Sequence, residues 1–424
     1  QYNKKGRMEM DRGADGKVFY GWWIVAACFM TMFCTFGIVY NCNGMFIVPV
    51  TEDMGFTRQQ MGMNSTIISS MMMIVSLFAG KIFKRFNVKM VMRVGAICLI
   101  AGYASYSLAQ SLYMFYASSV LVGLGLACTS TLPISIIINS WFNLKRGTAM
   151  GIASTGSGIG GMVLNQVAGK LIPAVGWRQS YLMLAGLMCI VILPCVFFII
   201  KKDPAEIGLE PFGGVGRIVT NAQEDGLTLS EAAKTKKFWI FIGILVVNAI
   251  ATGGVVQNLV PYISELGYSY SFGAIMASLN MASLAAGKFL LGNLYDRKGA
   301  RFSTVCSCTC SALAMGSMVL ASLFMPSFGL MLLCSGLGCA FGSTGIPILV
   351  RMVFGNKDYS SIYGISNFAS NLGGALSPLI IGRLFDVTGT YKTGFSLFCG
   401  LSVCAACAFF ALLSERKSSK TQAA

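Results

Sequence analysis

The sequence predicts an all-α membrane protein with twelve transmembrane helices in two similar halves. Composition and an internal repeat carry this prediction. Hydrophobic residues make up 55% of the 424 residues and charged residues only 11%, whereas soluble domains carry about 25% charged residues. The chain also resembles itself at a shift of half its own length, so its two halves are expected to share one architecture.

Short matched segments carry the repeat. GNLYDRKGAR at 292–301 matches GKIFKRFNVK at 80–89, a shift of 212 residues. One residue further on, Gly-Leu-Gly followed by Ser-Thr within 123–131 matches the same pattern within 336–344. A repeat of this length in a membrane chain predicts two bundles and an interface between them, which is where membrane transporters place their substrate.

Twelve stretches are long and apolar enough to span a bilayer, which takes about 20 residues. They lie at roughly 20–45, 58–80, 90–109, 112–139, 148–170, 178–200, 237–261, 271–293, 302–324, 327–350, 360–384 and 392–413. The first stretch is too long for a signal-peptide core, so we expect it to remain as a span. Many of the 49 glycines fall on the predicted spans, as at Gly156 and Gly160, where small residues let helix backbones approach closely.

Lysine and arginine set the predicted orientation. The loops after the even-numbered spans are rich in both, while the opposite loops are poor in cations and hold Glu52, Asp53 and Glu265. The positive-inside bias therefore puts both termini in the cytoplasm. The same bias accounts for the net charge of +16. Nucleic acid is not expected as a partner, because the basic residues lie in short loops between spans.

The halves are joined by a polar segment that contains several Pro and Gly residues. Its last part, LTLSEAAKTKKFW at 227–239, has the pattern of an amphipathic helix on the inner membrane surface. The predicted parts are cytoplasmic tails at 1–19 and 414–424, six-helix bundles at 20–200 and 237–413, and a cytoplasmic linker at 201–236.

No cofactor, metal site or enzymatic centre is predicted. The 15 cysteines lie along apolar stretches, where Cys is a small packing residue. Cys306 and Cys310 would share one helix face while Cys308 points away, which does not suit a metal ion. The chain has no His, the commonest metal ligand and proton carrier. No pairing of nucleophile and base suggests an enzyme.

The segment at 292–301, like its match at 80–89, is predicted to be a short cytoplasmic loop, and it resembles the signature loop of the major facilitator superfamily. In the first half Lys84 replaces its acidic residue and Asn87 its inner glycine. Within that superfamily the chain resembles the monocarboxylate transporter family, above all its bacterial oxalate:formate-antiporter-like branch. This resemblance covers about 20–410 and rests on GWWIVAACF at 21–29, WFNLKRGTAMGIASTGSGIGG at 141–161, GWRQSY at 176–181 and YGISNFASNLGGALSPLIIGRLFDVTGTY at 363–391.

The resemblance implies two pseudo-symmetric six-helix bundles around a central cavity, in a monomer of the bacterial inner membrane. It also gives the matched segments a gating role, in which they hold the bundles together on the inner side and then release them. Asp296 can meet a helix N-terminus or a cation, and Arg297 a carboxylate or carbonyls. The gating residues are Gly292, Asp296, Arg297 and Arg301, with Gly80, Lys84 and Arg85 in the first half.

Lys288 is the leading candidate for binding substrate. None of the 16 acidic residues lies well inside a predicted span, whereas Lys288 does, and intramembrane charge usually marks function. In the monocarboxylate family this place holds an Arg implicated in binding the substrate carboxylate; Lys is a point charge without that two-pronged fit. The alternative is snorkelling, because Lys288 lies only about 8 Å from the predicted end of its helix at 1.5 Å per residue.

Two features of related carriers are missing here. The oxalate branch carries a second cation on span 11, which aligns at or near Ser370, so a monoanion is expected rather than a dianion. Animal monocarboxylate carriers have an Asp one turn before the span-8 cation, where this chain has Leu284. Two coupling modes stay open: exchange of one anion for another with Lys288 always charged, or symport in which Lys288 also takes and releases a proton.

Uncharged polar residues are expected to complete the site, although each could instead form a helix–helix hydrogen bond. The candidates are Tyr40, Asn41, Gln257, Asn258, Asn280, Asn367 and Asn371, with Thr129, Ser130, Thr131, Ser343 and Thr344 beside them. The hypothesis is a secondary transporter that moves a small carboxylate by alternating access. Carriers of a neutral solute or a drug, and a non-transporting membrane sensor, are the alternatives.

Overall fold

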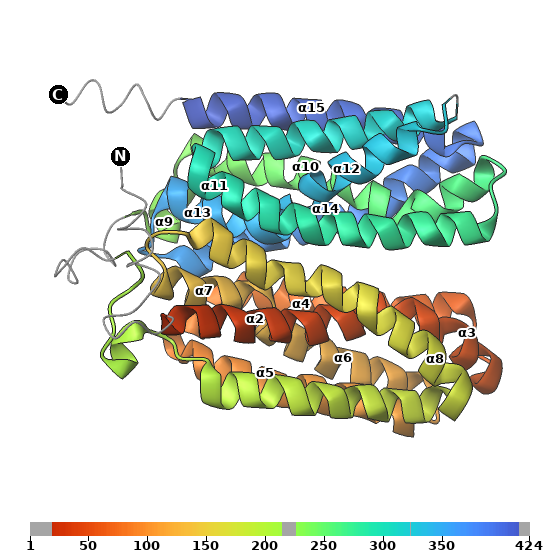
Figure 1. Ribbon diagram of the computed structural model, residues 1–424, viewed down its shortest axis with the longest axis horizontal. Helices are drawn as coiled ribbons and strands as arrows, with labels where there is room; N and C mark the ends of the chain where they lie inside the picture. The colour runs from red at the N-terminus through yellow and green to blue at the C-terminus, as the bar shows by residue number, and fades with distance from the viewer. Residues whose placement is uncertain (1–18, 214–225, 323, 415–424) are drawn as a thin grey trace. The chain divides into compact units, whose positions relative to one another are not determined.

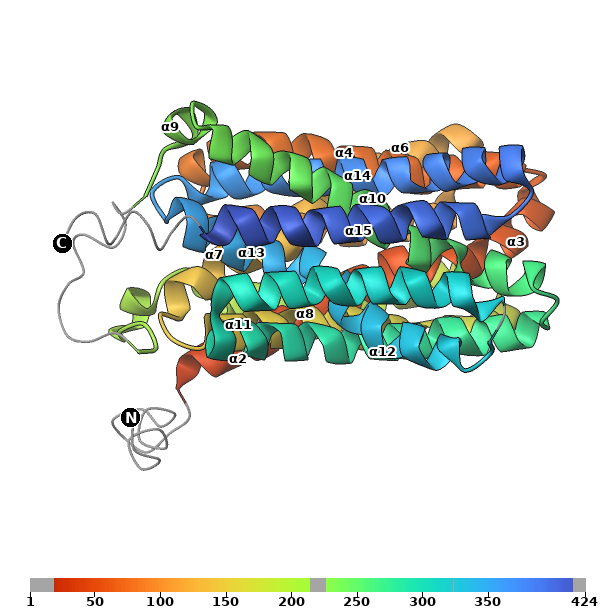
Figure 2. The ribbon, with the colours of Figure 1, turned by 90° about the horizontal axis from the view of Figure 1, so that it is seen from above.

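A computed structural model describes residues 19–213, 226–322 and 324–414. All regular elements in these ranges are helices, and the chain forms two compact units, Gln1–Ala222 and Gln223–Ala424. Within each unit the long helices lie alongside one another (Figures 1 and 2). The all-α fold predicted from the sequence is confirmed.

The elements of the first unit are α2 (Tyr20–Phe36), a π-helical turn (Gly37–Asn41), α3 (Asn43–Met54), α4 (Arg58–Arg85), α5 (Val88–Ser105), a 3-10 turn (Tyr106–Leu108), α6 (Leu112–Thr129), α7 (Thr131–Trp141), α8 (Arg146–Pro194), a second π-helical turn (Cys195–Ile199) and a second 3-10 turn (Pro204–Ile207). Those of the second unit are α9 (Leu229–Ala233), α10 (Lys236–Glu265), α11 (Tyr270–Ala321), α12 (Ser327–Cys339), a third π-helical turn (Phe341–Gly345), α13 (Ile346–Phe354), α14 (Tyr359–Thr388) and α15 (Tyr391–Ser414).

These helices can be divided into the predicted twelve spans. In the described ranges nine helical segments are long and apolar enough to cross a membrane. Two of them each contain two helices joined at a glycine of positive φ, Gly176 in α8 and Gly299 in α11, both with φ of 80°. α14 is less apolar, but its 30 residues are long enough to span a bilayer.

The matched segments 80–89 and 292–301 are mostly helical, which corrects the prediction that they are loops. The chain turns only near their ends, at Asn87 and Gly299. The Asn87 side chain accepts a hydrogen bond from the Lys89 amide at 3.0 Å and caps α5. Gly299 instead adopts a φ of 80°, which a residue with a Cβ adopts only with strain. The first half therefore makes this turn with a side-chain cap and the second half with a positive φ. For this reason Asn87 can stand in the first half where the second half has Gly299.

Glycines bring α8 and α2 into backbone contact in the first unit. A Cβ at Gly156 would lie 3.0 Å from the carbonyl carbon of Phe29, and one at Gly160 would lie 2.9 Å from that of Phe33. Both distances are shorter than an ordinary van der Waals contact, so a larger residue would force these helices apart. The close approach predicted for the glycine-rich spans is confirmed at these positions.

Polar side chains join the turns at one end of the first unit. Trp177 donates a hydrogen bond from Nε1 to the Asp53 carboxylate at 3.0 Å. Arg178 donates from Nη1 to the carbonyls of Ser107 and Ala109 at 3.0 and 2.8 Å, and its guanidinium stacks over the Trp177 ring. Three turns that are distant in sequence are thereby held together; we refer to these contacts as the Arg178 clasp.

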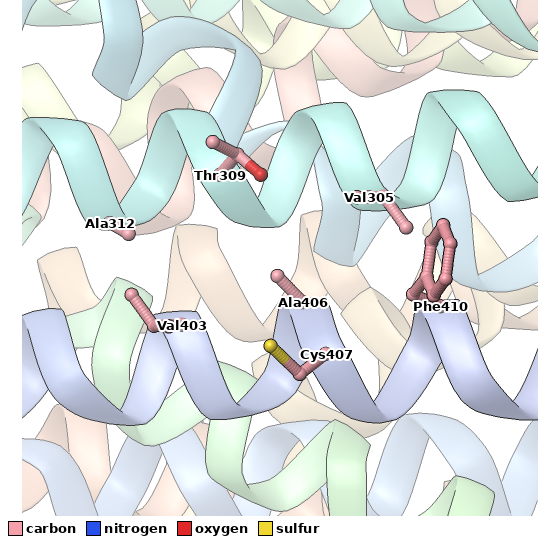
Figure 3. Close-up of a pocket in the computed structure, with 7 residues that line it drawn as sticks. All are labelled: Val305, Thr309, Ala312, Val403, Ala406, Cys407 and Phe410. Carbon is pink, nitrogen blue, oxygen red and sulfur yellow. The ribbon is translucent and has the colours of Figure 1, made fainter.

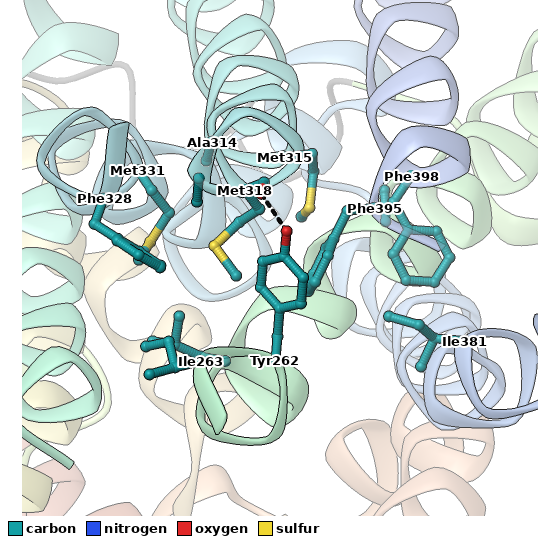
Figure 4. Close-up of a cluster of buried hydrophobic side chains, with 13 residues drawn as sticks. Tyr262, Ile263, Ala314, Met315, Met318, Phe328, Met331, Ile381, Phe395 and Phe398 are labelled. Atoms are coloured by element: carbon teal, nitrogen blue, oxygen red, sulfur yellow. Dashed lines mark hydrogen bonds between the residues drawn. The ribbon is translucent and has the colours of Figure 1, made fainter. Parts of the chain in front are cut away.

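The second unit has a core of buried side chains from α10, α11, α12, α14 and α15 (Figure 4). Tyr262 is buried in it, packs edge-on against Phe395 with ring centroids 5.0 Å apart, and donates a hydrogen bond to the carbonyl of Met318 at 2.8 Å. Nearby, Glu265 accepts a hydrogen bond from the amide of Tyr391 at 3.1 Å. Glu265 matches Asp53 at the 212-residue shift, so each unit uses an acid at this place to hold a neighbouring turn.

Backbone hydrogen bonds attach the linker to a turn in each unit. The Phe212 amide donates to the carbonyl of Trp141 at 2.9 Å, beside a bridge between Phe142 and Phe212. The Leu227 amide donates to the carbonyl of Phe354 at 2.8 Å. Phe142 and Phe354 match at the 212-residue shift, so the linker leaves the first unit and joins the second at equivalent turns.

An ion pair also holds the first part of the linker. Lys89 donates to the Glu206 carboxylate at 2.9 Å, and the Lys202 amide donates to the same side chain at 3.2 Å. Burial alone would raise the pKa of Glu206, but these contacts and the charge of Lys201 together hold that pKa below its usual value. Glu206 is therefore ionised at neutral pH.

The amphipathic helix predicted at 227–239 is shorter in the structure. α9 covers only Leu229–Ala233, and α10 begins at Lys236. Thr228 and Glu231 form a capping box at the start of α9, and Thr235 caps α10. α9 ends at its C-cap Lys234, and the N-cap Thr235 starts α10 directly after it. This cap also explains why one continuous pattern in the sequence becomes two helices.

Candidate functional site

Lys288 is buried, with 6% of its surface exposed, on the first helix of α11. The sequence predicts that this helix ends about 8 Å beyond Lys288. The helix instead continues to Lys298, just before the turn at Gly299, which is about 15 Å along the axis at 1.5 Å per residue. The burial of Lys288 weighs against the snorkelling alternative, because a snorkelling lysine presents its ammonium at the exposed surface.

Lys288 lies beside the break between α12 and α13. Cys339, the last residue of α12, lies near the Lys288 amine. Two turns further along the same face of α11, the Tyr295 hydroxyl lies 3.0 Å from where a Cβ would stand at Gly345. The face of α11 that carries Lys288 therefore packs against the π-helical turn Phe341–Gly345.

That π-helical turn contains the matched Ser-Thr pair of the second half. Thr344 is fully buried, and no described residue makes a hydrogen bond with its Oγ1. At the matched place in the first unit, Ser130 interrupts the helix between α6 and α7 with an extended backbone (ψ −153°). Both units thus break a helix at the same point of the repeat. Such irregular turns are frequent at functional sites.

Close packing of α11 on α12 holds Lys288 in place. A Cβ at Gly287 would meet the backbone of Gly336. On the same face Ser283 donates a hydrogen bond to a carbonyl of α12, and Ser335 donates to the Asn280 side chain at 2.6 Å. Asn280 therefore takes part in a helix–helix hydrogen bond, which is the alternative to a role in binding.

Tyr40 and Asn41 lie in the π-helical turn of the first unit. The Tyr40 ring stacks on Phe36, its hydroxyl hydrogen-bonds with Ser69 at 2.9 Å, and 41% of the residue is exposed. The Asn41 amide donates to the carbonyl of Ser157 on α8 at 3.2 Å. Asn41 thus ties two helices together, whereas Tyr40 keeps an accessible surface.

The asparagines of α14 lie on one helix face with a tyrosine. Tyr363, Asn367 and Asn371 are spaced four residues apart. Among the described residues, the buried Tyr363 hydroxyl and the Asn371 amide nitrogen have no hydrogen-bond partner. Asn258 and Asn367 are partly buried and each makes a further contact. The Gln257 side chain lies outside the part that the structure describes.

The gating candidates occupy different environments. Gly80 and Gly292 are buried in α4 and α11. The exposed candidates are Lys84, Arg85, Asp296 and Arg297. Arg301 is partly buried, and its guanidinium stacks on the ring of Phe410 on α15, 3.9 Å from the centroid.

Two residues were not singled out from the sequence: Cys339, which lies near Lys288, and Tyr363, which shares a face of α14 with Asn367 and Asn371. Their residue types are common in apolar helices, and the break that follows Cys339 leaves no mark in the apolar pattern. The recurrence of Ser-Thr at the matched positions was the available signal. In the described ranges no group of residues could hold a metal ion, and all fifteen cysteines are free thiols.

Comparisons with known proteins agree with this architecture. The model of the Major Facilitator Superfamily matches residues 27–378. Human monocarboxylate transporter 12 is 26% identical over 414 residues, which cover 91% of this chain and 78% of that protein. The uncharacterized MFS-type transporter YcxA of Bacillus subtilis (strain 168) is 25% identical over 375 residues, 83% and 85% of the two chains.

Among solved structures, the E. coli fucose:proton symporter FucP matches with a TM-score of 0.67 at 15% identity, over 92% of this chain and 98% of FucP. This likeness shows a shared fold. The family match itself extends over most of the sequence, from the first span into α14. The chain therefore belongs to the Major Facilitator Superfamily, and is a multi-pass membrane transporter rather than an enzyme.

Proposed function

We propose that this transporter moves a small monocarboxylate across the membrane by alternating access, with Lys288 binding the carboxylate. The observation that carries the proposal is the burial of Lys288, of which only 6% is exposed on a long helix of the second unit. A buried cation is costly to keep in a membrane protein without a function. Similarity to monocarboxylate transporter 12 supports the same substrate class.

The surroundings of Lys288 suit a single carboxylate. An ammonium makes charge-assisted hydrogen bonds with carboxylate oxygens, which are stronger than neutral ones. Thr344, in the π-helical turn that packs against α11, brings a hydroxyl oxygen without a partner among the described residues. No second Lys or Arg stands at the span-11 position near Ser370, which favours a monoanion over a dianion.

The proposed setting is the inner membrane of a bacterium, with both termini in the cytoplasm and the protein working as a monomer. Lys84, Arg85 and Lys298 lie at the ends of the matched helical segments, as the positive-inside bias expects of the cytoplasmic side. In this proposal the bundles 20–200 and 237–413 rock about the substrate, and the matched segments form the inner gate.

Counterflow in proteoliposomes tests the proposal directly. Purified protein is loaded with one carboxylate and offered labelled acetate, lactate, pyruvate or oxalate, with and without a pH gradient. We expect counterflow of monocarboxylates above that of oxalate. Dependence on the pH gradient would indicate proton symport, and its absence anion exchange. Counterflow of only an uncharged solute would contradict the carboxylate proposal.

Variants of Lys288 locate the binding group. Lys288→Gln should abolish uptake while insertion and thermal stability are retained, and Lys288→Arg should restore part of it because the charge is kept. Lys170→Gln is the matched control, since Lys170 is an exposed lysine of α8. Wild-type uptake by Lys288→Gln would reject the assigned role.

A further inference from the structure

An apolar groove runs along the surface of the second unit, between the second helix of α11 and α15 (Figure 3). Its volume is about 370 Å³. The lining residues are Val305, Thr309 and Ala312 from α11, with Val403, Ala406, Cys407 and Phe410 from α15. Thr309 is the one hydroxyl among these seven side chains, and small Ala residues form the floor.

A cation lies at one end of the groove. Arg301 is one helical turn before Val305, and its guanidinium lies 3.9 Å from the ring centroid of Phe410, which itself lines the groove. The Arg301 Nε is buried and has no hydrogen-bond acceptor among the described residues. Lys298 is exposed three residues earlier, before the turn at Gly299 and so on the first helix of α11, which leaves Arg301 as the cation next to the groove lining on the second helix.

The groove opens on an outward apolar surface. Val403 and Phe410 are 49% and 52% exposed, and their neighbours Phe302 and Leu313 are 54% and 49% exposed. In a membrane such a surface meets acyl chains, which would fill the apolar part whatever their headgroup. Selectivity must therefore come from Arg301, the charged residue at the end of the groove.

We propose that this groove binds one phospholipid with an anionic headgroup. An acyl chain lies against Ala312 and Ala406, and the headgroup phosphate accepts hydrogen bonds from the Arg301 guanidinium. The apolar stretch from Val305 to Ala312 is about 10 Å long at 1.5 Å per residue, enough for the first part of an acyl chain. Arginine suits a phosphate because its planar fork can donate two parallel hydrogen bonds. This lipid site is separate from Lys288, which lies in the first helix of α11.

Native mass spectrometry of the full-length protein tests the proposal. Protein is mixed with equal amounts of dioleoylphosphatidylglycerol and dioleoylphosphatidylcholine, which share acyl chains and differ in headgroup charge. We expect wild type to retain the anionic lipid about tenfold over the zwitterionic one, because the choline cation of the zwitterionic lipid repels Arg301 and offsets the attraction of its phosphate. Arg301→Gln should bring this ratio close to one, and Lys298→Gln, the matched control, should leave it unchanged.

Filling the groove tests the acyl chain separately. Ala406→Phe should reduce retention of the anionic lipid while Arg301 stays in place, and Cys407→Trp, at an exposed lining position, does the same if Ala406→Phe fails to fold. Leu397→Phe, an exposed position of α15 outside the groove, is the control. The proposal would be overturned if wild type retained both lipids equally, or if the Arg301 and Lys298 variants had equal effects. It would also be overturned if glycerophosphate, which has no acyl chain, displaced the bound lipid by itself.

Discussion

Adding one methyl group at Gly287 should destabilise the second unit and displace Lys288. A Cβ at Gly287 would lie 2.7 Å from the amide nitrogen of Leu337 and closer still to the carbonyl of Gly336. Ordinary van der Waals contact begins at 3.4 Å, so α11 and α12 must separate by at least the difference of 0.7 Å. Neither partner atom can move alone, because both belong to helix backbone.

The size of the effect follows from three terms. Overpacking a tight contact costs about 1–3 kcal/mol. Separation of the helices also weakens the hydrogen bond from Ser283 to α12, which adds about 1 kcal/mol. Ala has a higher helix propensity than Gly, which stabilises the variant by about 1 kcal/mol and offsets part of this loss. The net loss is about 2 kcal/mol, and at about 2–4 °C per kcal/mol for a unit of this size the midpoint should fall by about 4–8 °C.

Thermal unfolding of purified protein, followed by tryptophan fluorescence, measures this midpoint. Gly243→Ala in α10 and Gly400→Ala in α15 are matched controls, because no atom lies within 4 Å of a Cβ at either position. Both controls should match or slightly exceed the wild-type midpoint. If Gly287→Ala unfolds at the same temperature as Gly243→Ala, the close contact does not constrain the helices and the reasoning fails.

Three further predictions concern the turns and the linker. Arg178→Lys should weaken the hydrogen bonds from residue 178 to the carbonyls of Ser107 and Ala109. Each kcal/mol of stability lost in this way should lower the unfolding midpoint by about 2–4 °C. An unchanged midpoint would show that the Arg178 clasp does not contribute to stability. Gly299→Ala should destabilise by about 1–3 kcal/mol because Gly299 has φ of 80° and ψ of 174°, a conformation essentially restricted to glycine, and wild-type stability would contradict that strain. Because the pKa of Glu206 is lowered, its contribution to docking is complete above about pH 4.3 and is lost as pH falls through that lowered value. The protection factors of amides in 201–213, which are hydrogen-exchange rates corrected for the intrinsic pH dependence of exchange, should therefore fall on acidification. In Glu206→Gln they should be low at every pH, and a wild-type profile in that variant would refute the role of the ion pair.

The helical fold was predictable because long apolar stretches leave the backbone no alternative in a membrane. The residues at which the helices begin and end were harder to predict from the sequence. Polar residues in the matched segments suggest loops, yet Lys84 and Arg85 continue α4 because basic side chains favour the last turn of a helix. At 227–239 the decisive residue was Thr235, whose capping role the amphipathic pattern hides.

The candidate site was predictable in part. Lys288 stands out in the sequence because charge is rare in spans, and its burial fits that expectation. Asn280 and Asn371 are the same residue type in similar apolar surroundings, but Ser335 bonds the first while the second has an amide nitrogen without a described partner. Whether each asparagine has a hydrogen-bond partner depends on the residue that faces it from a neighbouring helix. The sequence around the asparagine does not contain this information. The π-helical turn beside Lys288 likewise has no sequence signature.

The linker docks at equivalent turns, at Phe142 in one unit and at Phe354 in the other. Only residues 214–225 lie between the docked ends, and from Gly213 to Gly226 a fully extended chain reaches about 45 Å. The linker therefore sets a maximum distance between the two turns. A conformational change of the transport cycle that moves the turns further apart than this must first break the backbone hydrogen bonds to Trp141 or Phe354.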